Sequence, residues 1–224
     1  MHQEHPAFAK PPEAARLWRY MTLPKLLTLL QTESLFFTRL DSLGDRFEGT
    51  LPERNVSLRR TSGRSLEDQQ IIRTNTLVNC WHLSRHESDA LWQIYGRNDA
   101  PVAIRTTGKR LSQCFSRSEH PVYIGMVYYT NYQFGGISPA YEKFSFLFKR
   151  DSFQHEREVR AVIRTSTPPA AGRYVKVDIA TLIDQVYVPS TAPDWLMDTI
   201  AQLLAKYGHP RPIKRSRQIP HDYL

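Results

Sequence analysis

The sequence predicts an α+β fold built as a single domain. Segments of strand and helix type, about eight or nine and five or six in number, follow one another without regular β-α alternation. A hydrophobic content of 41% and an aromatic content of 11% are typical of a globular protein. No GxxxxGK[ST] loop and no strand–GxGxxG–helix unit is present, which argues against P-loop and Rossmann folds. We expect one domain over residues 17–224, because no repeat or low-complexity linker divides the chain.

A strand–helix–strand unit is expected first. Residues 17–21 alternate as a strand, Thr22 can cap the following helix with Pro24 in its first turn, and residues 34–40 form a second strand. Arg19 is a charge among the apolar residues of the first strand, where an unpaired guanidinium is costly. Arg19 should therefore bind a carboxylate or a phosphate, and both a structural acid and a ligand remain open.

Two acids then occupy a loop. Asp45 and Glu48 lie in irregular chain near the turn residues Gly44 and Gly49. Acids displayed on a loop near a strand end often carry function, and turn or cap chemistry is the alternative for Asp45.

Further segments complete the fold. Trp92 and Tyr95 share one face of a helix expected over residues 90–97, either as core residues or as a stacking platform. The other expected strands cover residues 76–82, 101–106, 122–132, 174–179, 185–189 and 213–217. The other expected helices cover residues 65–73, 109–115 and 192–207.

Residues 144–164 carry the strongest functional signal. A run expected to be helical leads into a strand, and period 2 places Glu156, Glu158 and Arg160 on the face opposite the core. Acids at the mouth of a strand are common material for an active site. A solvated row of salt bridges on an edge strand is the alternative. Lys149 is the lysine near these acids.

The amino-acid composition bears on the cellular location of the protein. No run of about 18 apolar residues occurs, so we expect no membrane span. Residues 1–16 lack the basic and apolar blocks of a secretory signal, and we expect them to be a disordered lead-in. Cys80 and Cys114 are the only cysteines and have no metal-type spacing, which fits a reducing cytoplasm.

The net charge favours an anionic partner. A formal charge of +8 and a pI near 9.6 suit an anionic ligand or a nucleic acid, but no recognised nucleic-acid motif accompanies them. Candidate nucleic-acid-binding residues are the clustered cations Arg59, Arg60, Arg64, Lys214, Arg215 and Arg217.

Several hydrolase and metal signatures are absent. HExxH and GxSxG do not occur, and His82 and His86 straddle an expected strand end, which makes them a poor metal pair. A metal nuclease remains open as an alternative. Its residues would be Asp45, Glu48, Glu156, Glu158 and Lys149.

An ordered set of short motifs resembles a bacterial family, domain of unknown function 2971. The motifs span roughly residues 17–217, and one departure is Arg46, where the family usually has proline. The family name implies no activity. The motifs are Trp18-Arg19-Tyr20, Asp45-Arg46-Phe47-Glu48, Asn79-Cys80-Trp81, Leu91-Trp92-x-x-Tyr95 and Glu156-x-Glu158-x-Arg160.

The layout also resembles ADP-ribosyltransferase-like folds, which have a split β core with flanking helices. In those folds an Arg or His on the first strand precedes a helix, a second strand and a later Glu-x-Glu strand, whereas their Ser-Thr-Ser motif is missing here. The resemblance implies NAD as cofactor, Glu158 as catalytic acid and Glu156 as the group that orients or deprotonates the acceptor. Arg19 would clamp the phosphates. The resemblance further implies Tyr20, Trp81, Tyr95 and Arg160 as cofactor-binding residues. Another candidate site, which does not follow from the resemblance, comprises Asp45, Glu48, Trp92 and Lys149.

Three hypotheses remain open. The first is an NAD-dependent ADP-ribosyltransferase-like enzyme, a toxin or phage-defence effector that modifies a nucleic acid, nucleotide or protein and has an antitoxin or defence-system partner. The second is a basic nucleic-acid-binding module or nuclease. The third is a structural or interaction domain in which Arg19 pairs with Glu156 or Glu158. The enzyme hypothesis requires Arg19 and Glu158 to share a cleft.

Overall fold

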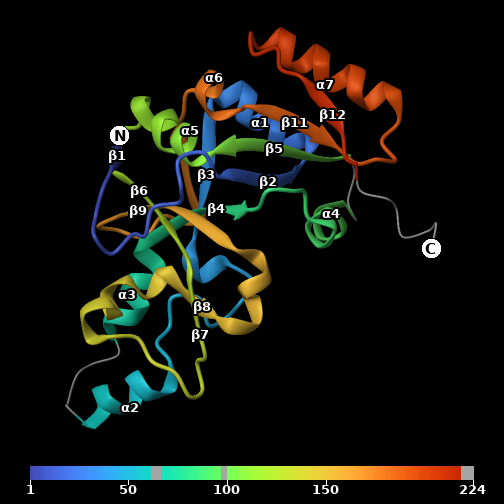
Figure 1. The fold of residues 1–224 in the computed structure, drawn as a ribbon. Helices are drawn as coiled ribbons and strands as arrows, with labels where there is room; N and C mark the ends of the chain where they lie inside the picture. Colours follow the sequence, from blue (N-terminus) through green and yellow to red (C-terminus); the bar gives the residue numbers. More distant parts are fainter. Residues whose placement is uncertain (62–66, 97–99, 218–224) are drawn as a thin grey trace, which may run out of the picture. The chain divides into compact units, whose positions relative to one another are not determined.

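A computed structural model describes residues 1–61, 67–96 and 100–217 (Figure 1). The chain forms two compact units, each assembled from three stretches. Unit 1 comprises residues 1–11, 36–80 and 119–175. Unit 2 comprises residues 12–35, 81–118 and 176–224. Strands β3 (Ser34–Arg39), β4 (Thr76–Leu83) and β10 (Gly172–Lys176) contribute residues to both.

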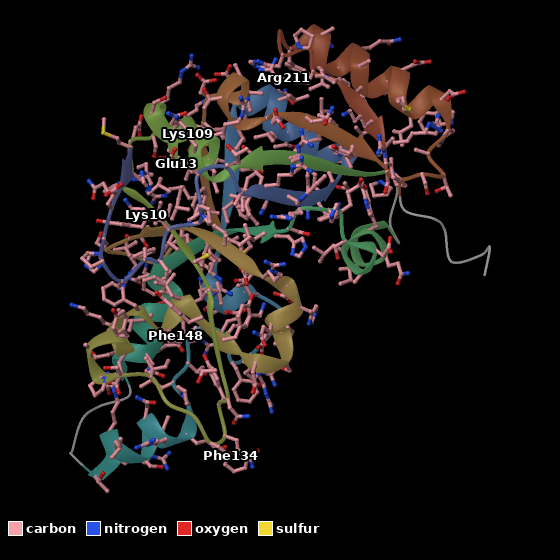
Figure 2. The ribbon with its side chains drawn as sticks, viewed as in Figure 1. Lys10, Glu13, Lys109, Phe134, Phe148 and Arg211 are labelled. Atoms are coloured by element: carbon pink, nitrogen blue, oxygen red, sulfur yellow. The ribbon has the colours of Figure 1, made fainter. Side chains whose placement is uncertain are left out.

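Unit 1 contains a mixed sheet. Strand β1 (His2–Gln3) pairs in parallel with β6 (Val122–Met126), which pairs antiparallel with β9 (Glu158–Arg164). The order continues from β9 to β4, β3 and β10. Two short strands, β7 (Tyr128–Thr130) and β8 (Phe148–Arg150), form a separate parallel pair. Phe148, labelled in Figure 2, stacks on Tyr128 with ring centroids 5.2 Å apart.

The helical elements of unit 1 are short. The α-helices are α2 (Glu53–Thr61) and α3 (Glu67–Asn75). The 3₁₀ helices are η1 (Leu40–Ser42), η3 (Pro139–Leu147) and η4 (Asp151–Glu156). Helix α3 packs against η1 and η3, and the core includes Leu40, Ile72, Phe146 and Val162.

Strand β9 is internal to its sheet. It lies between β6 and β4, and every residue from Glu158 to Ile163 is buried, so both of its faces are covered. The predicted alternation is present from Glu158 onward, where the Glu158 and Arg160 side chains meet on one face, but the alternative of a solvated edge strand is wrong. Its charged face therefore needs partners inside the protein.

The expectation of a disordered lead-in over residues 1–16 is corrected by the structure. His2 pairs with Val122 in the sheet, and the Met126 amide donates to the Ala9 carbonyl at 2.8 Å. Ala7 and Phe8 are buried in the core of unit 1. Two apolar residues in a polar stretch are enough to anchor this segment, because its backbone hydrogen bonds are satisfied by β6.

Unit 2 holds a second strand arrangement. The last residues of β4 pair with β2 (Arg16–Thr22), which pairs antiparallel with β5 (Pro101–Thr107). Strand β11 (Gln185–Val188) pairs antiparallel with β5 and in parallel with β12 (Ile213–Arg215). The helices are α1 (Leu23–Thr32), α4 (Asp89–Gly96), α5 (Gly108–Gln113), η2 (Cys114–Arg117), α6 (Ile179–Leu182) and α7 (Asp194–Lys206).

Sequence signals account for the longest helices. Helix α1 has proline in its first turn, buries Leu26, Leu29 and Leu30, and ends where Glu33 adopts a left-handed conformation (φ 45°). Helix α7 packs against β12 (Figure 1) and is followed by Gly208 at φ 76°. A large mixed sheet with flanking helices confirms the predicted α+β class. Within the described ranges, no helix has the length and apolar character needed to cross a membrane.

Candidate functional site

The candidate site is an ion cluster in unit 1 at the start of β9. Helix η4 ends at Glu156, Arg157 turns the chain in the left-handed region (φ 42°, ψ 55°), and Glu158 then opens the strand. Glu156 therefore precedes the strand rather than belonging to its alternation. Its side chain is 28% exposed, whereas that of Glu158 is 6% exposed. The positive φ of Arg157, which the sequence does not signal, gives the two acids different environments.

Arg160 is fully buried and holds Glu158 in place. Its Nε donates to Glu158 Oε1 at 2.8 Å, and its Nη2 donates to Glu158 Oε2 at 3.0 Å. The same Nη2 reaches Glu48 at 2.8 Å, and Nη1 donates to the Phe146 carbonyl at 2.7 Å. This corrects the expectation that Arg160 binds a cofactor, because a guanidinium with no exposed surface and all three nitrogens engaged cannot contact a ligand.

Lys149 of β8 joins the acids. Its Nζ lies 2.6 Å from Glu156, 3.2 Å from Glu48 and 3.5 Å from Glu158. Glu48 reaches the cluster because Gly49 turns the loop at φ 71°, and a Cβ at this glycine would lie 2.4 Å from Leu40 Cδ2. Three carboxylates thus share two cations, which leaves the cluster with one net negative charge.

Neighbouring charges move the pKa values of Glu158 and Lys149 further from neutral pH. Burial alone would raise the pKa of Glu158, but Arg160 and Lys149 outweigh it and lower that pKa to about 2; a hydrogen bond with the Cys80 thiol contributes further. Burial would lower the pKa of Lys149, and the three acids raise it above its ordinary value. Glu158 is therefore an ionised, immobilised carboxylate at neutral pH.

Two contacts that sequence reasoning missed border the cluster. Tyr129 accepts a hydrogen bond from the Glu158 amide at 2.8 Å, and burial raises the pKa of its phenol to about 12. Arg150 binds Asp45 through Nε and Nη2 at 3.2 and 3.0 Å and lies over the Phe47 ring at 4.6 Å. The sequence indicated Lys149 only as the lysine near the acids and indicated no role for Arg150. On the short strand β8, the Lys149 side chain reaches Glu156 and the neighbouring Arg150 side chain reaches Asp45. No sequence pattern predicts these two directions.

A hollow of about 310 Å³ lies in the same unit. Asp45 does not line it directly but holds Arg150, which does. Its lining residues are Phe47, Leu51, Glu53, Asn131, Tyr132, Gln133, Arg150, Asp151 and Ser152.

The other predicted cofactor residues belong to unit 2. Arg19 is half-buried on β2 with its guanidinium 5.9 Å from the centroid of the Trp81 ring. Tyr20 accepts a hydrogen bond from the Ser88 amide at 2.7 Å and packs edge-on against Trp92. Tyr20, Trp81 and Trp92 are buried, which is typical of core aromatics. Their ligand-binding roles stay predictions, and the side chain of Tyr95 lies outside the described part of the structure.

The predicted nucleic-acid-binding cations fall into two groups. Arg59 donates to Glu142 at 2.9 Å, and Arg215 binds Asp194 and the Ala192 carbonyl. These two guanidinium groups form intramolecular contacts that stabilise the fold. Exposed cations are Arg60 in unit 1 and Lys214 and Arg217 in unit 2, whereas Arg64 lies outside the described residues. In the three described ranges, no group of His, Cys, Asp and Glu side chains is arranged to hold a metal ion.

Comparison with known proteins gives a remote structural likeness. No family model matches the chain, so the resemblance to domain of unknown function 2971 has no support from that comparison, and no curated protein matches it. Solved structures of DarT from Thermus sp. 2.9 resemble it with a TM-score of 0.43. The complex with ADP-ribosylated ssDNA is 10% identical and covers 94% of this chain and 97% of that one. The NAD⁺ complex is 11% identical, with 92% and 97% covered.

Proposed function

We propose that this protein is an NAD-dependent ADP-ribosyltransferase-like enzyme in which Glu158 is the catalytic carboxylate. The observation that carries the proposal is the carboxylate itself, which opens β9, stays ionised and is held by two nitrogens of Arg160. The chain order supports it, because Arg19 lies on β2, which α1 and β3 follow as in the layout predicted from the sequence.

The chemistry of ADP-ribosyl transfer needs such a group. The bond between ribose C1′ and the nicotinamide nitrogen breaks with its electron pair going to nicotinamide, and positive charge develops at C1′. The acceptor oxygen or nitrogen then bonds to C1′ and loses its proton. A carboxylate that is already oriented and accepts a hydrogen bond from a ribose hydroxyl stabilises this charge without reorganising.

The low pKa of Glu158 defines its role. A carboxylate with a pKa of about 2 is a poor general base at neutral pH, because proton transfer to it is unfavourable. It remains a full negative charge that can accept a hydrogen bond. We therefore assign Glu158 to electrostatic stabilisation of the ribose cation rather than to deprotonation of the acceptor.

Arg19 is the proposed clamp for the NAD phosphates. A guanidinium offers a planar pair of donors that matches phosphate oxygens. The acceptor is a nucleic acid, nucleotide or protein, and the charge of +8 favours a polyanion. We further propose a bacterial toxin or phage-defence effector, acting in the cytoplasm and controlled by an antitoxin or defence-system protein. No disulfide joins Cys80 and Cys114, which agrees with that proposed location.

Calorimetric titration with NAD tests the proposal. Wild-type protein should bind NAD with micromolar affinity, and Arg19→Ala should abolish measurable binding. Arg117→Ala is the matched control, since Arg117 is an exposed arginine of the same unit that pairs with Glu33. Absence of binding by wild-type protein, or equal binding by Arg19→Ala, contradicts the proposal.

Nucleic-acid binding without catalysis is the second candidate. The exposed side chains of Arg60, Lys214 and Arg217 favour it. This function predicts affinity for single- or double-stranded nucleic acid that falls steeply with salt and does not respond to NAD.

A further inference from the structure

The Lys149 ammonium lies at a different distance from each of the three acids around it. Its Nζ lies closest to Glu156, at 2.6 Å, and farthest from Glu158, at 3.5 Å. The Lys149 side chain is 9% exposed, its backbone is paired with Tyr129 of β7, and its ammonium lies 4.7 Å from the centroid of the Phe153 ring. With the backbone and the ring fixed, the competing carboxylates decide where the ammonium lies.

These unequal distances determine how far Lys149 occupies Glu158 Oε2. That oxygen accepts from Arg160 Nη2 at 3.0 Å, and Lys149 approaches it only at 3.5 Å. A carboxylate offers about four acceptor sites, and Arg160 and the Cys80 thiol occupy three of them, so Glu158 retains capacity for a donor from a substrate. An ammonium drawn fully onto Oε2 would occupy that capacity and neutralise the charge that must stabilise the ribose cation.

We propose that Glu156 is a positioning residue that acts on Glu158 through Lys149. Its carboxylate draws the Lys149 ammonium away from Glu158 and keeps Oε2 able to accept a hydrogen bond from the ribose. The inference rests on the proposed function. It differs from the role that the resemblance to ADP-ribosyltransferase-like folds implied for Glu156, which was to orient or deprotonate the acceptor directly.

A double-mutant cycle separates the two roles. Nicotinamide release from NAD is measured for wild-type protein, Glu156→Gln, Lys149→Met and the double variant. Glu156→Gln should lower kcat by about tenfold or more with little change in KM, because the ammonium is then shared by Glu48 and Glu158 alone and moves closer to Glu158. Adding Lys149→Met should restore kcat to within about threefold of the Lys149→Met value, because residues in contact couple non-additively.

A conservative variant and a control keep the test decisive if the double variant does not fold. Glu156→Asp keeps the charge beside Lys149 and should retain activity within about threefold of wild type. Glu119→Gln, an exposed acid of the same unit, should behave as wild type. Losses that add in the double variant, or Glu156→Asp as impaired as Glu156→Gln, would overturn the inference and assign Glu156 a direct role.

Failure of this inference differs from failure of the proposed function. Full activity of Glu156→Gln alongside inactive Glu158→Gln refutes the positioning role and leaves the catalytic carboxylate in place. Full activity of Glu158→Gln refutes both.

Discussion

Replacing Arg160 with methionine should destabilise unit 1 severely. Arg160 has no exposed surface and is the shared hydrogen-bond partner of Glu158, Glu48 and the Phe146 carbonyl. Methionine fills a similar volume but leaves two buried carboxylates and a buried carbonyl without this donor. Breaking a buried ion pair by removing one partner typically costs about 3–5 kcal/mol of unfolding free energy.

The structure places Arg160→Met at the lower end of that range. Lys149 remains 3.2 Å from Glu48 and 3.5 Å from Glu158 and offsets part of the loss, so we expect ~3 kcal/mol. This is a large share of the roughly 5–15 kcal/mol that stabilises a folded domain. Urea denaturation followed by far-UV circular dichroism should show a midpoint lowered by about 1 M or more.

Arg164→Met is the matched control for this experiment. Arg164 is the exposed last residue of β9 and lies over the Phe146 ring at 5.5 Å, so its loss should cost less than about 1 kcal/mol. A cost below ~1 kcal/mol for Arg160→Met, or equal costs for both variants, would refute the argument that Arg160 stabilises unit 1 through its buried ion pairs.

Three further predictions concern stability. The pKa of Glu158 is lowered from 4.5 to about 2, so its ionised form contributes ~3 kcal/mol to the free energy of unfolding. This contribution is complete above pH 4.5 and is lost as the pH falls toward 2. The acid denaturation of Glu158→Gln should lack this loss. Gly49→Ala should cost about 1–3 kcal/mol in thermal unfolding, because φ is 71° and Leu40 blocks the Cβ; an unchanged Tm would contradict this. Phe8→Ala should cost about 3 kcal/mol or more and increase proteolysis of residues 1–11; protection equal to wild type would count against the anchoring role.

Local signals predicted much of the fold. The strand–helix–strand order through β2, α1 and β3 follows from the alternation around Arg19, from the Thr22 cap and from Pro24, all of which act within a few residues. Helix α7 is equally local, with Gly208 at its end. The anchoring of Phe8 was missed because it depends on β6, more than a hundred residues away in the sequence.

The acids of the site could be predicted from the sequence, but the residues with which they form ion pairs could not. Glu158 and Glu48 could be singled out as charges at a strand mouth and in a loop. Their common partner Arg160 lies 112 residues from Glu48, and no short-range rule joins them. Glu156 was expected on the strand, and the left-handed Arg157 moves it onto η4 instead. A non-glycine residue at positive φ has no dependable sequence signature.

The measurement that tests the central claim most directly is nicotinamide release from NAD by wild-type protein, Glu158→Gln and the control Glu119→Gln. Glutamine keeps the shape of Glu158 and removes its charge. Removing one oriented electrostatic stabiliser typically lowers kcat by about 10²–10³. We predict that loss for Glu158→Gln, with a folded protein by circular dichroism and an unaffected control. Wild-type turnover by folded Glu158→Gln would contradict the assignment of Glu158 as the catalytic carboxylate.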